Sequence, residues 1–222
     1  MEEDGLTFLE MQTEVFRRLE ESSSSPVYWT LAQVKESINK GLREIADATE
    51  FYETSDTIAL TASTYVYDLT DTATWSFSPA ILTVKACHND QTNRWMRPTT
   101  VQELDRQMMP KWQEATGEPD QWYIRGLWWL GFDSAVSSTA GTVTVYYTAL
   151  PSDLSADGDT PGFPQEFHLG LVDFAIYDSL CQVGENVKAL YFFRRYKERE
   201  EGLKRYVQQR LIHDRVGSFG NR

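Results

Sequence analysis

The chain has 222 residues, of which 41% are hydrophobic, 13% aromatic and 24% charged. This length suits one large domain or two small ones, and it is sufficient to bury a hydrophobic core. The net charge is −12, which argues against nucleic acid as a specific ligand.

Charge is distributed unevenly along the chain. Residues 187–222 hold ten Lys or Arg and four Asp or Glu, a net charge of +6, so the remaining 186 residues carry −18. A basic segment on an acidic body indicates that the two parts contact different surfaces.

The chain starts with MEEDGLTFLEMQTEVF, which lacks the basic and apolar regions of a signal peptide. No apolar run approaches the roughly 18 residues of a membrane span. We therefore expect a soluble protein that is made in a cytoplasm and has no membrane partner.

Two amphipathic helices are predicted near the start of the chain. Apolar residues recur near helical spacing over residues 6–21. Thr30 is a predicted N-cap for a second helix over residues 31–52, which has a continuous apolar stripe. The polar link SSSSP between them favours an antiparallel helix pair.

The pattern changes to strands at Thr57. TIALTASTYVYDL, AILTVKAC and GTVTVYYTAL are rich in β-branched and aromatic residues, and a short helix is predicted over Thr99–Gln113. The segment QWYIRGLWWLGF fits either a tight hairpin or one strand bent at Gly126. Residues 57–150 are therefore expected to form a small antiparallel β unit with one inserted helix.

The last part of the chain predicts a second helix pair. An acidic loop over residues 151–164 leads into a helix over 165–181 that is apolar around most of its circumference, so it should lie at the centre of the core. A charged helix is expected over 187–213 and a flexible tail over 214–222. The predicted fold is α+β: residues 1–56 and 151–213 form a four-helix bundle, with the β unit inserted between the two helix pairs.

The sequence offers little for catalysis or metal binding. Neither His88, His168 nor His213 has metal-ligand spacing, and His168 is expected to be a structural histidine. Cys87 and His88 should point to opposite faces of a strand, and Cys87 and Cys181 are both expected to be buried free thiols. The acidic loop resembles part of a calcium loop but lacks the closing Glu, which favours a solvated loop. We expect no catalytic residues, no metal and no cofactor.

Three tryptophans, Trp122, Trp128 and Trp129, lie in one short segment without an evident reactive group. Such a segment is typical of a packing surface, either within a subunit or between subunits. The alternatives are stacking on sugars or on bases, and the acidity of the chain disfavours the second.

Two stretches carry a family resemblance. The first has Trp112, Thr116, Gly117, Pro119 and Tyr123. The second has Tyr147, Pro151, Leu154, Asp157, Asp159, Pro161, Pro164, Phe167, His168, Leu171, Val172 and Ala175. In this order, over nearly the whole chain, they resemble the head-to-tail adaptor (connector) proteins of tailed bacteriophages.

The resemblance implies a structural virion protein, not an enzyme, located at the head–tail junction and made in the host cytoplasm. It implies a helix bundle with a β insertion, and a ring of neighbouring copies, commonly dodecameric, under the portal protein. Such a ring extends the DNA channel, lets DNA pass without specific binding, and offers a platform for the tail or the next connector.

In this family the C-terminal helix and tail often reach the portal. Here the contacts would be Arg210, Arg215, Phe219 and Arg222. A basic tail suits an acidic partner, and Phe219 between two glycines can serve as an anchor. The alternative is a carbohydrate-binding or tail-fibre-associated module that uses the tryptophan-rich segment.

Overall fold

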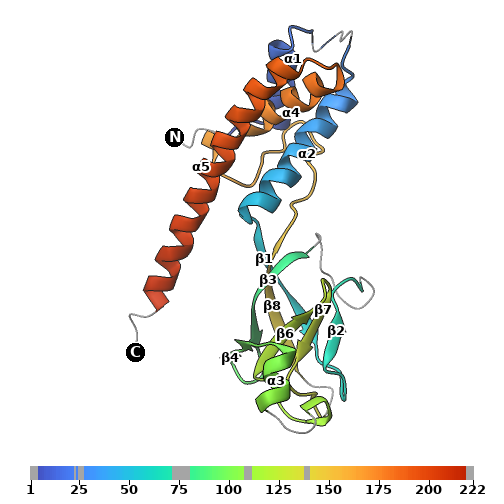
Figure 1. Cartoon of the computed structure of the whole chain (residues 1–222), viewed down its shortest axis with the longest axis vertical. Coiled ribbons are helices and arrows are strands. Elements are labelled where there is room, and N and C mark those ends of the chain that lie inside the picture. Colours follow the sequence, from blue (N-terminus) through green and yellow to red (C-terminus); the bar gives the residue numbers. More distant parts are fainter. Residues whose placement is uncertain are drawn as a thin grey trace. The chain divides into compact units, whose positions relative to one another are not determined.

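The computed structural model describes residues 5–22, 24, 28–71, 81–107, 112–137 and 141–218, with side chains up to Arg210. The chain divides into two compact units: a helical unit of Met1–Tyr52 and Leu150–Arg222, and a β unit of Glu53–Ala149. Figure 1 shows the four longer helices in the first unit and the strands in the second. The predicted α+β class is therefore confirmed.

One hydrophobic core joins the helices of the helical unit. They are α1 (Phe8–Arg18), α2 (Leu31–Thr49), α4 (Leu169–Gln182) and α5 (Asn186–Ser218), with a short 3-10 helix, η2 (Gln165–Phe167), before α4. Helix α4 contacts α1, α2 and α5, and eight of its residues are buried. Its apolar sequence thus reflects a central position, as predicted.

Capping boxes fix the starts of α1 and α2. The hydroxyls of Thr7 and Thr30 each accept a hydrogen bond from the backbone N–H three residues later, at Glu10 and Gln33. The side chains of Glu10 and Gln33 in turn accept from the backbone N–H of the capping threonines, at 2.8 and 2.9 Å. The prediction of Thr30 as an N-cap is confirmed.

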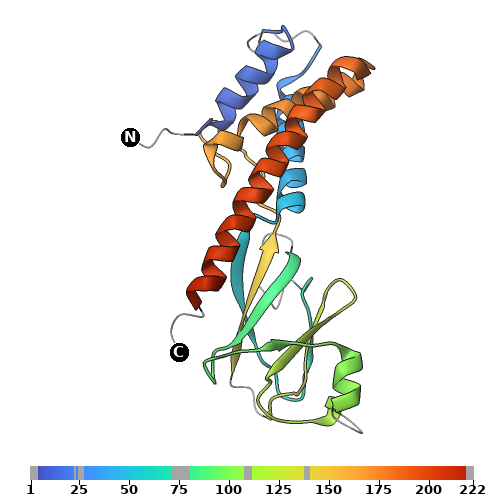
Figure 2. The same cartoon turned by 60° about the vertical axis from the view of Figure 1, so that its left-hand side comes forward.

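Helix α5 is the longest element, with 33 residues and a length of about 50 Å. The helix was predicted to end at His213 but continues to Ser218. Its side chains pack against the helical core as far as Val207, and Gln208–Arg210 are exposed. Figure 2 shows this end of α5 extending past the other helices of its unit.

The β unit contains two four-stranded sheets. The first has the order β1-β8-β3-β4, and the second has the order β2-β7-β6-β5. Their bounds are β1 (Glu53–Ala59), β2 (Val66–Asp68), β3 (Ile81–Asn89), β4 (Arg94–Trp95), β5 (Arg97–Pro98), β6 (Gln121–Arg125), β7 (Trp129–Phe132) and β8 (Thr142–Ala149). All pairings are antiparallel except that of β5 with β6. Strand β1 starts before the expected Thr57.

The inserted helix is shorter than predicted. Helix α3 spans Val101–Gln107 instead of Thr99–Gln113, and a 3-10 helix, η1, follows at Trp112–Glu114. Residues 108–111 of the predicted helix lie outside the described residues.

The chain passes between the two units at adjacent positions. It leaves the helical unit after Tyr52 and returns at Leu150. In the first sheet Glu53 pairs with Thr148, so the outgoing and returning strands are neighbours.

Candidate functional site

The described residues contain no group of three or more His, Cys, Asp and Glu side chains that could hold a metal ion. No described helix combines the length and apolarity that crossing a bilayer requires.

The two cysteines have different environments. Cys87 is buried, and burial raises the pKa of its thiol. The adjacent His88 contacts the Asp90 carboxylate at 2.9 Å. Cys181 is exposed, so the expectation that both thiols are buried was wrong for this residue.

Each of the three clustered aspartates in the acidic loop has a protein partner. Asp153 pairs with Arg43 at 2.7 Å and Asp157 pairs with Lys35 at 3.4 Å. The Asp159 carboxylate accepts the backbone N–H groups of Ser155 and Ala156 at 2.7 and 2.8 Å. These ion pairs hold the loop to α2, and the side chains of Asp153 and Asp157 remain exposed, as expected for a loop in contact with solvent.

The same loop completes the start of α1 and is fixed by a buried amide. The carbonyl oxygens of Asp159 and Asp157 accept hydrogen bonds from the N–H groups of Phe8 and Leu9, at 2.7 and 3.0 Å. The buried Asn39 side chain of α2 donates to the Leu154 carbonyl and accepts from the Leu154 N–H, at 3.0 and 2.9 Å. The loop thus connects α1 and α2, which makes it a structural element.

A fully buried carboxylate, Asp173 of α4, binds three arginines. Arg18 of α1 donates to it at 2.9 Å, Arg195 of α5 lies 3.5 Å away, and Arg199 of α5 makes a short hydrogen bond. Burial raises the pKa of Asp173, and the three guanidinium groups oppose this shift. Sequence analysis missed this cluster, although the charge of Asp173 amid the apolar run LGLVDFAI was a usable signal that it would need a partner.

His168 has a structural role, as predicted. It is buried, its Nε2 lies 2.8 Å from the Phe163 carbonyl oxygen, and burial lowers its pKa. Because a carbonyl can only accept, Nε2 carries the proton of the neutral ring.

The residues of the family resemblance also have packing roles. In the β unit, Trp112 and Tyr123 pack edge to face with ring centroids 5.5 Å apart, beside Leu104 and Tyr65. In the second stretch, Tyr147 lies in β8 of the β unit, and the residues from Pro151 onward supply the loop described above, η2 and the start of α4 in the helical unit. The distinctive order of these residues therefore encodes the fold of each unit.

The predicted portal contacts are only partly described. The Arg210 guanidinium lies 4.8 Å from the centre of the Tyr206 ring. Arg215 belongs to α5, with its side chain undescribed, and Phe219 and Arg222 lie outside the described residues.

The three tryptophans of the segment QWYIRGLWWLGF have different environments. Trp122 is 7% exposed and packs inside the β unit, whereas Trp128 and Trp129 are 42% and 46% exposed. Gly126 adopts a φ of 64° and allows the tight turn between β6 and β7. The segment is thus a hairpin, and we call Ile124, Leu127, Trp128 and Trp129, all exposed, the hairpin tip.

A second exposed aromatic group lies on the first sheet of the β unit. Trp95 is 60% exposed and packs against His88 and Tyr146, with ring centroids 5.1 and 5.2 Å away. We call His88, Trp95 and Tyr146 the aromatic face. Sequence analysis did not predict it, because its members come from three separate strands.

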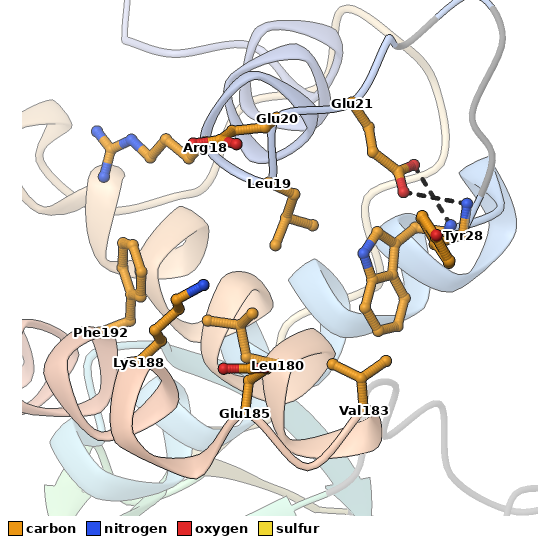
Figure 3. Close-up of a pocket in the computed structure, with 11 residues that line it drawn as sticks. Arg18, Leu19, Glu20, Glu21, Tyr28, Leu180, Val183, Glu185, Lys188 and Phe192 are labelled. Carbon is orange, nitrogen blue, oxygen red and sulfur yellow. Dashed lines mark hydrogen bonds between the residues drawn. The ribbon is translucent and has the colours of Figure 1, made fainter.

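A cavity of about 610 Å³ lies in the helical unit between the ends of α1 and α4 and the start of α5. Figure 3 shows Leu19, Leu180 and Phe192 on its walls, and Glu21, which accepts the backbone N–H groups of Tyr28 and Trp29. Among the described residues that line it there is no histidine, cysteine or serine.

Comparison with known proteins agrees with these structural roles. A family model described as SU10 adaptor protein matches residues 6–217, nearly the whole chain. No curated protein matches the chain. The resemblance found in the sequence is confirmed: the chain belongs to the SU10 adaptor protein family, which is a family of structural bacteriophage adaptors and not a class of enzymes.

Proposed function

We propose that this protein is a head-to-tail adaptor. Its copies form a ring, commonly of twelve in the resembling proteins, beneath the portal protein in the virion. The ring extends the DNA channel, lets DNA pass without specific binding, and gives the tail or the next connector a docking platform. The observation that carries the proposal is the family match over residues 6–217. We also propose that α1, α2, α4 and α5 form the expected four-helix bundle.

The C-terminal end of α5, with residues 219–222, is the proposed portal contact. Arg195 and Arg199 already bind Asp173 within the helical unit. Lys204 and Arg210 form no ion pair with another described side chain, and the core ends at Val207. Lys188 and Arg194, nearer the start of α5, are also exposed. Residues 210–222 hold three arginines and one aspartate, and this local excess of basic charge suits an acidic surface.

The test is to mix the purified protein with portal rings of its own phage and image the mixture by negative stain. A protein truncated after His213 and the charge reversal Arg210→Glu are compared with the full-length chain. Lys188→Glu is the matched control, because Lys188 is exposed at the opposite end of α5. We expect rings stacked on the portal for the full-length protein and for Lys188→Glu, with loss of stacking in the other two.

The other outcomes are equally informative. Stacking by all four proteins would retain the adaptor function and place the portal contact elsewhere. If none of the four proteins stacked on the portal, the result would count against the adaptor proposal. If sugars then quenched tryptophan fluorescence, the exposed Trp128 and Trp129 would support a carbohydrate-binding module instead.

A further inference from the structure

We infer that the hairpin tip of one copy docks on the aromatic face of the next copy, so that these two surfaces close the ring. The inference rests on the proposed function, because it assigns the contact between neighbouring subunits of that ring. The occupant of each surface is thus a second copy of this chain.

Ring symmetry requires two different surfaces on each subunit. In a head-to-tail ring, a patch on one copy must fit a distinct patch on its neighbour, and the two patches must point in different directions. The β unit carries two such patches on different sheets: the hairpin tip joins β6 and β7, and the aromatic face spans β3, β4 and β8. Figure 2 shows the β6–β7 turn at the right of the β unit and the β3–β4 turn at its left.

The aromatic face is an uncovered sheet surface. Along β8, Val143, Val145 and Tyr147 point inward and are buried, whereas Thr144 and Tyr146 alternate with them and are more exposed. On neighbouring strands, His88 pairs with Thr144 and with Trp95, which extends the surface to the sheet edge. An exposed aromatic surface of this kind is typical of a protein contact.

The hairpin tip has complementary chemistry. Leu127 is 79% exposed and stands beside Trp128, and tryptophan and arginine are the residues that contribute most at interface centres. Arg125, at the end of β6, is exposed and forms no ion pair with another described side chain.

An anion on the aromatic face can receive this cation. The Asp90 carboxylate is held in place by the hydroxyls of Thr142 and Thr144, each at 2.9 Å, and its side chain is 31% exposed. Arg125 of one copy and Asp90 of the next would therefore form a charge pair at the rim of an apolar contact. Exposed Arg94, next to Trp95, offers a cation to the incoming tryptophans.

Engineered cysteines test the contact in the assembled complex. Cys181→Ser first removes the exposed thiol, and Cys87 remains because it is buried. Leu127→Cys places a thiol on the hairpin tip, and Ala86→Cys places one opposite Tyr146 on the aromatic face. The double variant, each single variant and a mixture of the two single variants are oxidised, alone and with portal rings, and analysed on denaturing gels.

A head-to-tail contact predicts a specific result. The double variant gives a ladder of covalent oligomers, the mixture of single variants gives dimers only, and each single variant stays monomeric. Dimers from Leu127→Cys alone would indicate a symmetric contact and overturn the inference, as would the absence of cross-links in every sample. Portal stacking without a ladder would leave the adaptor function intact and refute this contact between subunits. A ladder without stacking would support the contact between subunits and count against the proposed docking on the portal.

Discussion

The helical unit and the β unit differ in the interactions that join their separate elements. In the helical unit, ion pairs join separate elements, as between Asp173 and the arginines of α1 and α5. In the β unit, pairing between strands joins most of the elements, and Arg97–Asp120 is an ion pair among its described residues. Both units leave aromatic side chains exposed, among them Tyr28 and Tyr191 in the helical unit and Trp95 in the β unit. A buried ion cluster fastens the helices of one unit to each other, whereas hydrogen bonds between strands hold the other unit together.

Two spectroscopic signals can follow the units separately. Six of the seven tryptophans lie between residues 53 and 149, so tryptophan fluorescence reports mainly on the β unit. Far-ultraviolet circular dichroism reports mainly on the helices. A variant that destabilises one unit alone should therefore shift one signal and leave the other in place.

Asp173→Asn is expected to have the largest effect. It removes the buried charge that compensates three arginines, so the free energy of unfolding of the helical unit should fall by about 3–5 kcal/mol. Urea unfolding followed by circular dichroism measures it. Glu201→Gln breaks the exposed pair with Arg205 and should cost less than about 1 kcal/mol. An equally small loss in both variants would show that the buried cluster does not stabilise the unit.

Gly131→Ala should destabilise the β unit alone. A Cβ at this position would collide with the ring of Tyr123, so we expect a loss of about 1–3 kcal/mol. The fluorescence transition should shift while the circular dichroism transition of the helices stays in place. Gly117→Ala is the control, because nothing lies within 4 Å of its Cβ position. A shift of both transitions would mean that the two units unfold together.

Thr30→Ala removes one half of the capping box of α2 and should cost the helical unit about 1 kcal/mol. Thr13→Ala removes an exposed hydroxyl that donates to the Leu9 carbonyl within the same helix, and this change should be near neutral. Thermal unfolding followed by circular dichroism compares the two. Equal melting temperatures would indicate that the cap contributes nothing measurable.

Acid should weaken the helical unit in two stages, each a small effect. Burial holds the pKa of His168 below its ordinary 6.5, so the unfolded chain binds a proton more readily, and stability falls as the pH drops below 6.5. Hydrogen bonds from Arg17, chiefly, lower the pKa of Glu14 from 4.5 to about 2, so its stabilisation is present above pH 4.5 and is lost toward pH 2.

His168→Gln separates the first stage from the second. A glutamine amide can still donate to the Phe163 carbonyl but does not titrate, so the variant should lose the fall in stability that begins as the pH drops below 6.5. Melting temperatures above and below this pH measure it. The same slope in both proteins would rule out His168 as its source.

Local patterns predicted the elements better than the contacts between them. Helical spacing and the cap at Thr30 predicted α2, and alternation predicted β8. The convergence of Arg18 on Asp173 joins residues 155 positions apart, for which the sequence has no local signal. The hairpin segment likewise gave no indication that Trp122 would be buried and Trp128 exposed, because this depends on where the turn falls: Trp122 lies within β6, whereas Trp128 lies in the turn that follows it. The extension of α5 past His213 follows from the low cost of lengthening an existing helix.

The pairing of Glu53 with Thr148 bears on the evolution of the protein. Antiparallel partners have Cα atoms about 4.5–5.5 Å apart, so the β unit begins and ends at nearly the same point in space. A segment with adjoining ends can be exchanged or deleted by recombination without opening the scaffold that carries it. The helical unit could thus retain its fold across related phages while the module between Tyr52 and Leu150 changes with the partners it must meet.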